Sequence, residues 1–70
     1  MSLYGESYDM ADFLAQMPAE QREVIELRNL QGMPFKEIAE RMDRSAGAVR
    51  MLWMRAIRRL REAMESEVAE

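Results

Sequence analysis

The stretch FKEIAERMDRSAGAVR, residues 35–50, contains the features that decide the fold. Its first half repeats apolar residues at i, i+3, i+4 and i+7, the spacing of one helix face. These residues are Phe35, Ile38, Ala39 and Met42. The pattern stops at Asp43 and Arg44, which predicts a tight turn, and Ser45 then offers a hydroxyl that can cap the start of another helix.

The helix that follows Ser45 is expected to be the longest of the chain, because its apolar period continues to Leu60. At 100 degrees per residue, one face is apolar and is predicted to point inward. It consists of Val49, Trp53, Ala56 and Leu60, with Leu52 and Ile57 beside them. The opposite face contains Gly47, Met51, Met54 and Arg58, flanked by Arg50 and Arg55. This outward face therefore starts with small residues and is bordered by guanidinium groups.

A short helix, a tight turn and a second helix with a small N-terminal half describe a helix-turn-helix motif. Ala39 is expected where the two helices approach most closely, and Ile38 and Val49 are expected to close the small core between them. Gly47 and Ala48 keep the first turn of the second helix thin enough to enter a DNA major groove about 12 Å wide.

Two further helices are predicted before this motif, which makes the fold all-α with four helices. The first is expected over residues 9–16 with Asp9 as its N-cap, and Pro18 separates it from the second. The second helix has a broad apolar arc that includes Leu30, and Gly32 is placed to end it in a left-handed conformation. The predicted organisation is a leader or linker end over residues 1–8, a domain over 9–65 and an acidic, fraying tail over 66–70.

The composition of the 70 residues excludes several classes of site. The chain has no cysteine and no histidine, so disulfides, thiolate zinc sites and imidazole bases cannot occur. Its glutamates lie at helical surface spacings without a predicted cleft or metal cluster. We therefore expect no enzyme activity, no cofactor and no metal. No segment resembles a membrane span or a secretion signal, so a cytoplasmic protein is expected.

The net charge of −3 conceals a strongly basic segment. Residues 1–43 carry four basic and nine acidic side chains, residues 44–61 carry six arginines and no acid, and residues 62–70 carry four glutamates. A merely solvated helix face would mix the two signs to gain i, i+4 pairs. The segregation instead predicts a nucleic-acid surface, on which Arg50, Arg55, Arg58 and Arg59 contact phosphates and the amides near Ser45 bind an anion.

Several motifs of the chain, in their order and spacing, resemble region 4 of the sigma-70 family of transcription initiation factors, particularly the extracytoplasmic-function type. They are MPAEQREVIELR at 17–28, Gly32, FKEIAERM at 35–42, SAGAVR at 45–50 and RAIRRL at 55–60. The likeness covers roughly residues 13–60. It implies a domain whose last helix enters the major groove of the minus-35 promoter element.

The resemblance also implies which residues face DNA and which partners the domain has. The DNA-facing positions carried over by the resemblance are Arg44, Ser45, Gly47, Arg50, Met51, Met54, Arg55 and Arg58. The implied partners are double-stranded promoter DNA, the flap of the RNA polymerase β subunit and an anti-sigma protein. No membrane partner is implied.

The chain departs from the family pattern in two places. Asp43 and Arg44 stand in the turn where a glycine and an apolar residue are usual, and Met51 to Met54 replace residues that are commonly polar. The two methionines fit either contacts with thymine methyl groups or a protein partner. Two alternative functions therefore stay open, a helical protein-interaction module and a DNA-binding domain of the response-regulator type.

Overall fold

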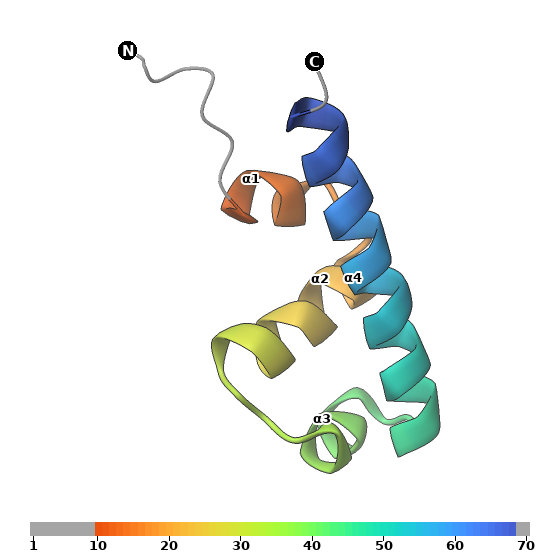
Figure 1. Ribbon diagram of the computed structural model, residues 1–70. Coiled ribbons are helices and arrows are strands. Elements are labelled where there is room, and N and C mark those ends of the chain that lie inside the picture. The colour runs from red at the N-terminus through yellow and green to blue at the C-terminus, as the bar shows by residue number, and fades with distance from the viewer. Residues whose placement is uncertain (1–9, 69–70) are drawn as a thin grey trace.

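The computed structural model describes residues 10–68, and in this part of the chain all regular structure is helical (Figure 1). The elements are α1 (Met10–Ala15), α2 (Ala19–Ile25), the π-helical turn η1 (Glu26–Leu30), α3 (Phe35–Met42) and α4 (Ala46–Val68). The expected four-helix, all-α fold is confirmed. Asp9, the expected cap of the first helix, lies outside the described residues.

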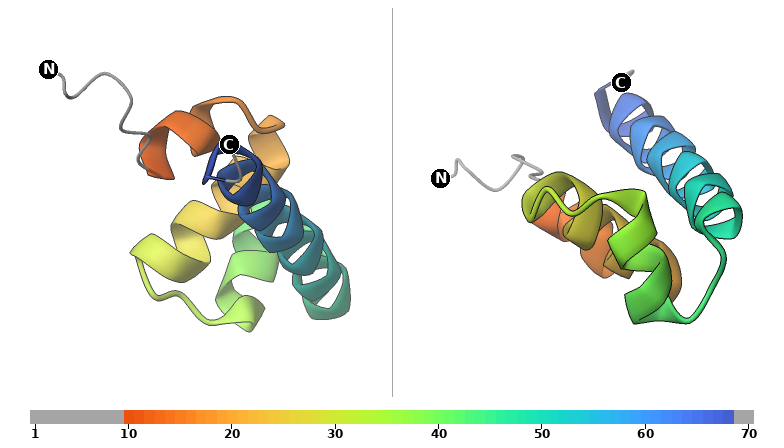
Figure 2. Two further views of the ribbon diagram at one scale, coloured as in Figure 1. Left: turned by 45° about the horizontal axis from the view of Figure 1, so that its top comes forward. Right: turned by 90° about the horizontal axis from the view of Figure 1, so that it is seen from below.

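The long helix α4 crosses the three shorter helices and packs on each of them, as the views in Figure 2 show. The core lies along this contact and contains the apolar residues that the helical periods predicted. Its members are Phe13, Leu14, Met17, Val24, Ile25, Leu27, Ile38, Ala39, Val49, Leu52, Ala56 and Leu60. Ile38 and Val49 are completely buried, in agreement with their predicted place between the two helices of the motif.

The end of the second helix differs from the prediction. The helix widens into η1, where the amide of Gln31 donates to the carbonyl of Glu26 at 3.1 Å, five residues back. Gly32 then adopts φ 69°, as predicted, and the amide of Met33 bonds to the carbonyl of Leu27 at 2.9 Å. In this arrangement Leu27 is buried but Leu30 is 63% exposed. The expectation that Leu30 belongs to the apolar arc is therefore wrong.

The turn between α3 and α4 is held by two local devices. Asp43 adopts the left-handed conformation, with φ 58° and ψ 49°, and the amide of Arg44 donates to the carbonyl of Ala39 at 2.9 Å. Ser45 caps α4 as predicted, because its Oγ accepts a hydrogen bond from the amide of Ala48 at 3.0 Å. These contacts fix the direction in which α4 leaves the turn.

α4 continues to Val68, past the arginine-rich segment and into residues for which a fraying tail was expected. Glu62, Ala63 and Met64 are good helix formers, and Ala63 packs against the core, which accounts for the extension. Within residues 10–68, no helix combines the length and the apolar run that a membrane crossing needs.

Candidate nucleic-acid interface

The exposed face of α4 is the candidate interface, and its position follows from the burial of the opposite face. Val49 and Ala56 are completely buried against the core, so the residues half a turn away point to solvent. All nine predicted site residues are exposed. They are Arg44, Ser45, Gly47, Arg50, Met51, Met54, Arg55, Arg58 and Arg59.

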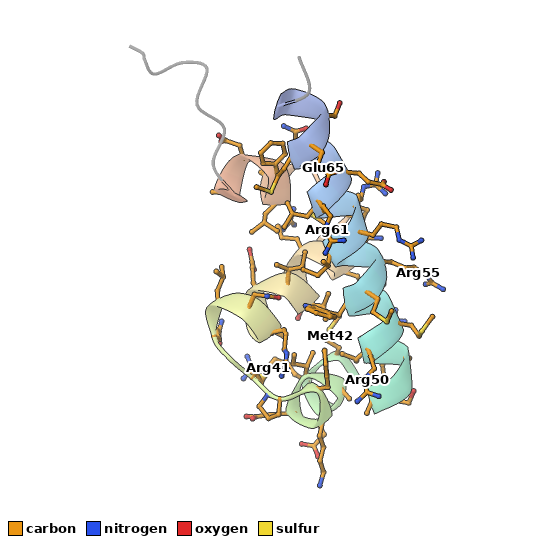
Figure 3. All side chains as sticks on the ribbon, in the orientation of Figure 1. Arg41, Met42, Arg50, Arg55, Arg61 and Glu65 are labelled. Atoms are coloured by element: carbon orange, nitrogen blue, oxygen red, sulfur yellow. The ribbon has the colours of Figure 1, made fainter. Side chains whose placement is uncertain are left out.

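Three of the arginines that are predicted to contact phosphates remain available for a partner. Arg55, Arg58 and Arg59 have no ion pair or hydrogen bond to another side chain in the described part of the chain. Arg55 points away from the other helices in Figure 3. A guanidinium that the fold leaves unpaired keeps all five donors for a partner, and phosphate matches its planar fork.

Arg44 is placed differently from the other arginines. Its guanidinium forms an ion pair with the carboxylate of Glu20, which lies in the first turn of α2. Both side chains remain largely exposed, so the pair is open to solvent and to salt. Arg44 therefore stays a predicted DNA contact, but its guanidinium is already engaged by an acidic group in this fold.

Arg50, labelled in Figure 3, lies over the ring of Phe35, the first residue of α3. Its guanidinium carbon is 5.5 Å from the centre of the Phe35 ring, and that of Arg28 is 4.3 Å from the same centre. Trp53 meets Phe35 edge-on, with 5.6 Å between the ring centroids. This cation–π contact limits the rotamers of Arg50 while its side chain stays exposed.

Arg28 and Asn29 were not predicted to take part in this region. Arg28 donates to the carbonyl of Met33 at 3.2 Å, and Asn29 accepts a hydrogen bond from Trp53 Nε1 at 2.8 Å. Both residues belong to η1, and Asn29 and Trp53 are 24 positions apart in the chain. A contact of that separation leaves no periodic signal. The one sequence feature that could have indicated a role for Arg28 here is its basic charge within the mainly acidic residues 1–43.

The N-terminus of α4 combines little bulk with unpaired backbone donors. Ser45 Oγ is occupied by the amide of Ala48, which leaves the amides of Ala46 and Gly47 at the positive end of the helix dipole. A Cβ added to Gly47 would meet nothing within 4 Å. The backbone is therefore open to the close approach of a partner at this point.

Two apolar side chains interrupt the basic face. Met51 is 51% exposed and Met54 is 48% exposed, which agrees with their predicted outward direction. Trp53, predicted to point inward, is half-buried at the edge of the core instead of fully enclosed. The face thus offers both guanidinium groups and flexible apolar contacts.

Comparison with known proteins bears on the identity of this fold. The family model described as Sigma-70, region 4 matches residues 7–60, which include the turn, Ser45 and most of the basic face. Comparisons with curated proteins and with solved structures gave no match. Because the matched segment spans well over half of the sequence and the structure is the helical arrangement that the resemblance implied, the chain belongs to the sigma-70 region 4 family, whose domains bind DNA in transcription initiation.

Proposed function

We propose that this domain recognises the minus-35 element of a promoter through α4 and contacts RNA polymerase through a separate surface. The observation that carries the proposal is the set of arginines on the exposed face of α4 that have no ion pair within residues 10–68, in a chain whose net charge is −3. Arg50 and Arg59 lie on opposite flanks of this face, and Arg55 and Arg58 lie between them. This spread suits the two phosphate strands that border a major groove.

The specific part of the recognition is assigned to the start of α4. Gly47 lets the backbone approach base edges, and Met51 and Met54 offer apolar contacts to thymine methyl groups. Arg50 is held by the Phe35 ring, so it loses little side-chain entropy when it meets a phosphate.

Salt dependence tests the proposal most directly. If four arginines neutralise phosphates, the affinity for promoter duplex falls about a hundredfold between about 50 and about 200 mM salt. Arg50→Ala should weaken binding to all sequences and lower the salt slope by about one. A flat salt response would contradict DNA binding, and a loss confined to one base pair would make Arg50 a base-reading residue.

The polymerase contact rests on family membership alone, and its expected position is the β flap. An anti-sigma protein is the second protein partner that membership suggests. Capture of polymerase core by the immobilised domain, with and without competing promoter duplex, tests whether the two surfaces are separate. Loss of capture in the presence of duplex would show that they overlap.

A second candidate function is a protein-interaction module, and the exposure of Met51 and Met54 favours it. Replacing both methionines by glutamine separates the two functions. A module that binds protein through this patch loses that partner but keeps the salt-dependent binding to DNA. A domain that reads thymine methyl groups loses discrimination between promoter and random duplex.

A further inference from the structure

One side of α4 carries a groove that shares Met54 and Arg58 with the proposed DNA face and continues toward the C-terminal end of the helix. It consists of two adjoining depressions that share Ile57 and Arg61. The first has a volume of about 260 Å³ and is lined by Trp53, Met54, Ile57, Arg58 and Arg61. The second has a volume of about 320 Å³ and is lined by Ile57, Leu60, Arg61, Met64 and Glu65. Every one of these lining residues belongs to α4.

The residues of this groove have the spacing of a helix-packing seam. Met54, Ile57, Arg61 and Met64 follow one another at intervals of three, four and three residues. Met54 and Met64 are exposed and Ile57 is only half-buried, so their apolar surface remains open. The aliphatic part of an arginine can pack in such a seam while its charged end stays in water. A second helix can therefore lie along this side of α4.

The order of the charges along the seam indicates what kind of helix is complementary to it. Arg58 and Arg61 are followed by Glu62 and Glu65, so the two signs are separated along one exposed side. Figure 3 shows Arg61 and Glu65 one turn apart on the same side of α4, away from Arg55. A surface that is basic in one half and acidic in the other is complementary to itself when a copy runs in the opposite direction.

We infer that two copies of this chain associate through an antiparallel α4–α4 contact, in which Arg58 faces Glu65 of the partner subunit. The parallel arrangement is disfavoured, because it would bring arginines opposite arginines and glutamates opposite glutamates. The contact also compensates a local conflict within the helix. Glu65 lies in the last turn of α4, at the negative end of the helix dipole, and the partner's basic half neutralises it.

The contact is a single helix face, so the association is weak. Stable interfaces bury roughly 1,200 Å² or more, and one pair of helix faces of this length supplies less. We expect a monomer–dimer equilibrium with a dissociation constant on the order of 100 µM. No step of this inference depends on DNA binding, but the contact uses Met54 and Arg58 of the proposed DNA face, so the measurement is made without DNA.

Sedimentation equilibrium of the full chain tests the inference, over concentrations from about 10 µM to about 1 mM at low salt. Each single charge reversal, Arg58→Glu or Glu65→Arg, should weaken the dimer about tenfold, because two symmetric ion pairs become repulsive. The double variant R58E/E65R should restore the dissociation constant to within about threefold of the original. Both residues are exposed, so the fold, followed by circular dichroism, should be retained.

Arg59→Glu is the matched control, since it reverses an exposed charge on the same helix but outside the seam. It should leave the dissociation constant within about twofold. A monomer at every concentration, or a double variant no better than the single ones, would overturn the inference. Open-ended assembly would overturn it too, because a two-fold contact closes at the dimer.

Discussion

The indole Nε1 of Trp53 donates a hydrogen bond to Oδ1 of Asn29 at 2.8 Å, which ties the middle of α4 to the π-helical turn η1. The bond lies at an exposed edge, where Phe35 contacts the same indole edge-on. It therefore connects the helix that carries the basic face to the element that precedes the helix-turn-helix motif.

Asn29→Ala should lower the free energy of unfolding by about 0.5 to 1 kcal/mol, the usual value of one accessible hydrogen bond. Asn29→Asp keeps an acceptor oxygen at the same place and is expected to retain most of that stability. Urea unfolding followed by the fluorescence of Trp53, the one tryptophan of the chain, measures both variants. Equal losses in the two variants would show that the side-chain oxygen does not hold the indole.

Much of the fold could be predicted because it depends on local signals. The apolar periods predicted the buried faces of α1, α3 and α4, and single residues marked the ends: Gly32 with its positive φ and Ser45 with its capping bond. Such signals act over a few residues and remain readable in the sequence. They were sufficient to place Arg50, Arg55 and Arg58 on the exposed face of α4.

The features that escaped prediction depend on contacts between distant segments. The ion pair of Arg44 with Glu20 and the bond of Trp53 to Asn29 each join residues 24 positions apart, and no periodic pattern encodes them. The π-helical turn η1 was also missed. The amino-acid composition of a segment does not show whether its hydrogen bonds span four residues or five. Its effect was the exposure of Leu30.

The pair between Glu20 and Arg44 predicts that an acidic residue restrains DNA binding. Glu20→Gln should change the free energy of unfolding by less than about 1 kcal/mol, because both side chains are exposed. It releases Arg44 beside the start of α4, so affinity for promoter duplex should rise about threefold. Fluorescence anisotropy with labelled duplex measures this change.

Glu23→Gln provides the control for Glu20→Gln. It removes the same charge from an exposed position of α2 that lacks an ion pair within residues 10–68. If the affinity for promoter duplex rises equally in the two variants, the cause is the change in net charge, and the specific release of Arg44 is refuted. The variant E20Q/R44A should lose the gain, because the freed guanidinium is then absent.

Gly32 and Asp43, which both adopt positive φ, predict opposite effects of substitution. Gly32→Ala should lower the free energy of unfolding by about 1 kcal/mol through backbone strain alone, because the added Cβ meets nothing within 4 Å. Asp43→Gly should raise it by about 0.5 kcal/mol, since glycine adopts φ 58° without a Cβ penalty. Thermal or urea unfolding of the two variants measures both changes in the free energy of unfolding. A loss of stability in D43G would mean that the aspartate side chain stabilises the turn.

Gly47 allows the effects of stability and of DNA contact to be separated in one substitution. The residue lies in the first turn of α4, where alanine is the better helix former and a new Cβ meets no protein atom. Gly47→Ala should therefore raise the free energy of unfolding by about 0.5 kcal/mol. If the backbone approaches base edges at this point, the same methyl group collides with DNA, and affinity should fall about tenfold or more with an unchanged salt slope.

Ser66→Ala is the control, because it improves helix propensity at an exposed site far along α4 and should leave affinity unchanged. A Gly47→Ala domain that is more stable and binds duplex as tightly as before would place the DNA elsewhere than at the N-terminus of α4.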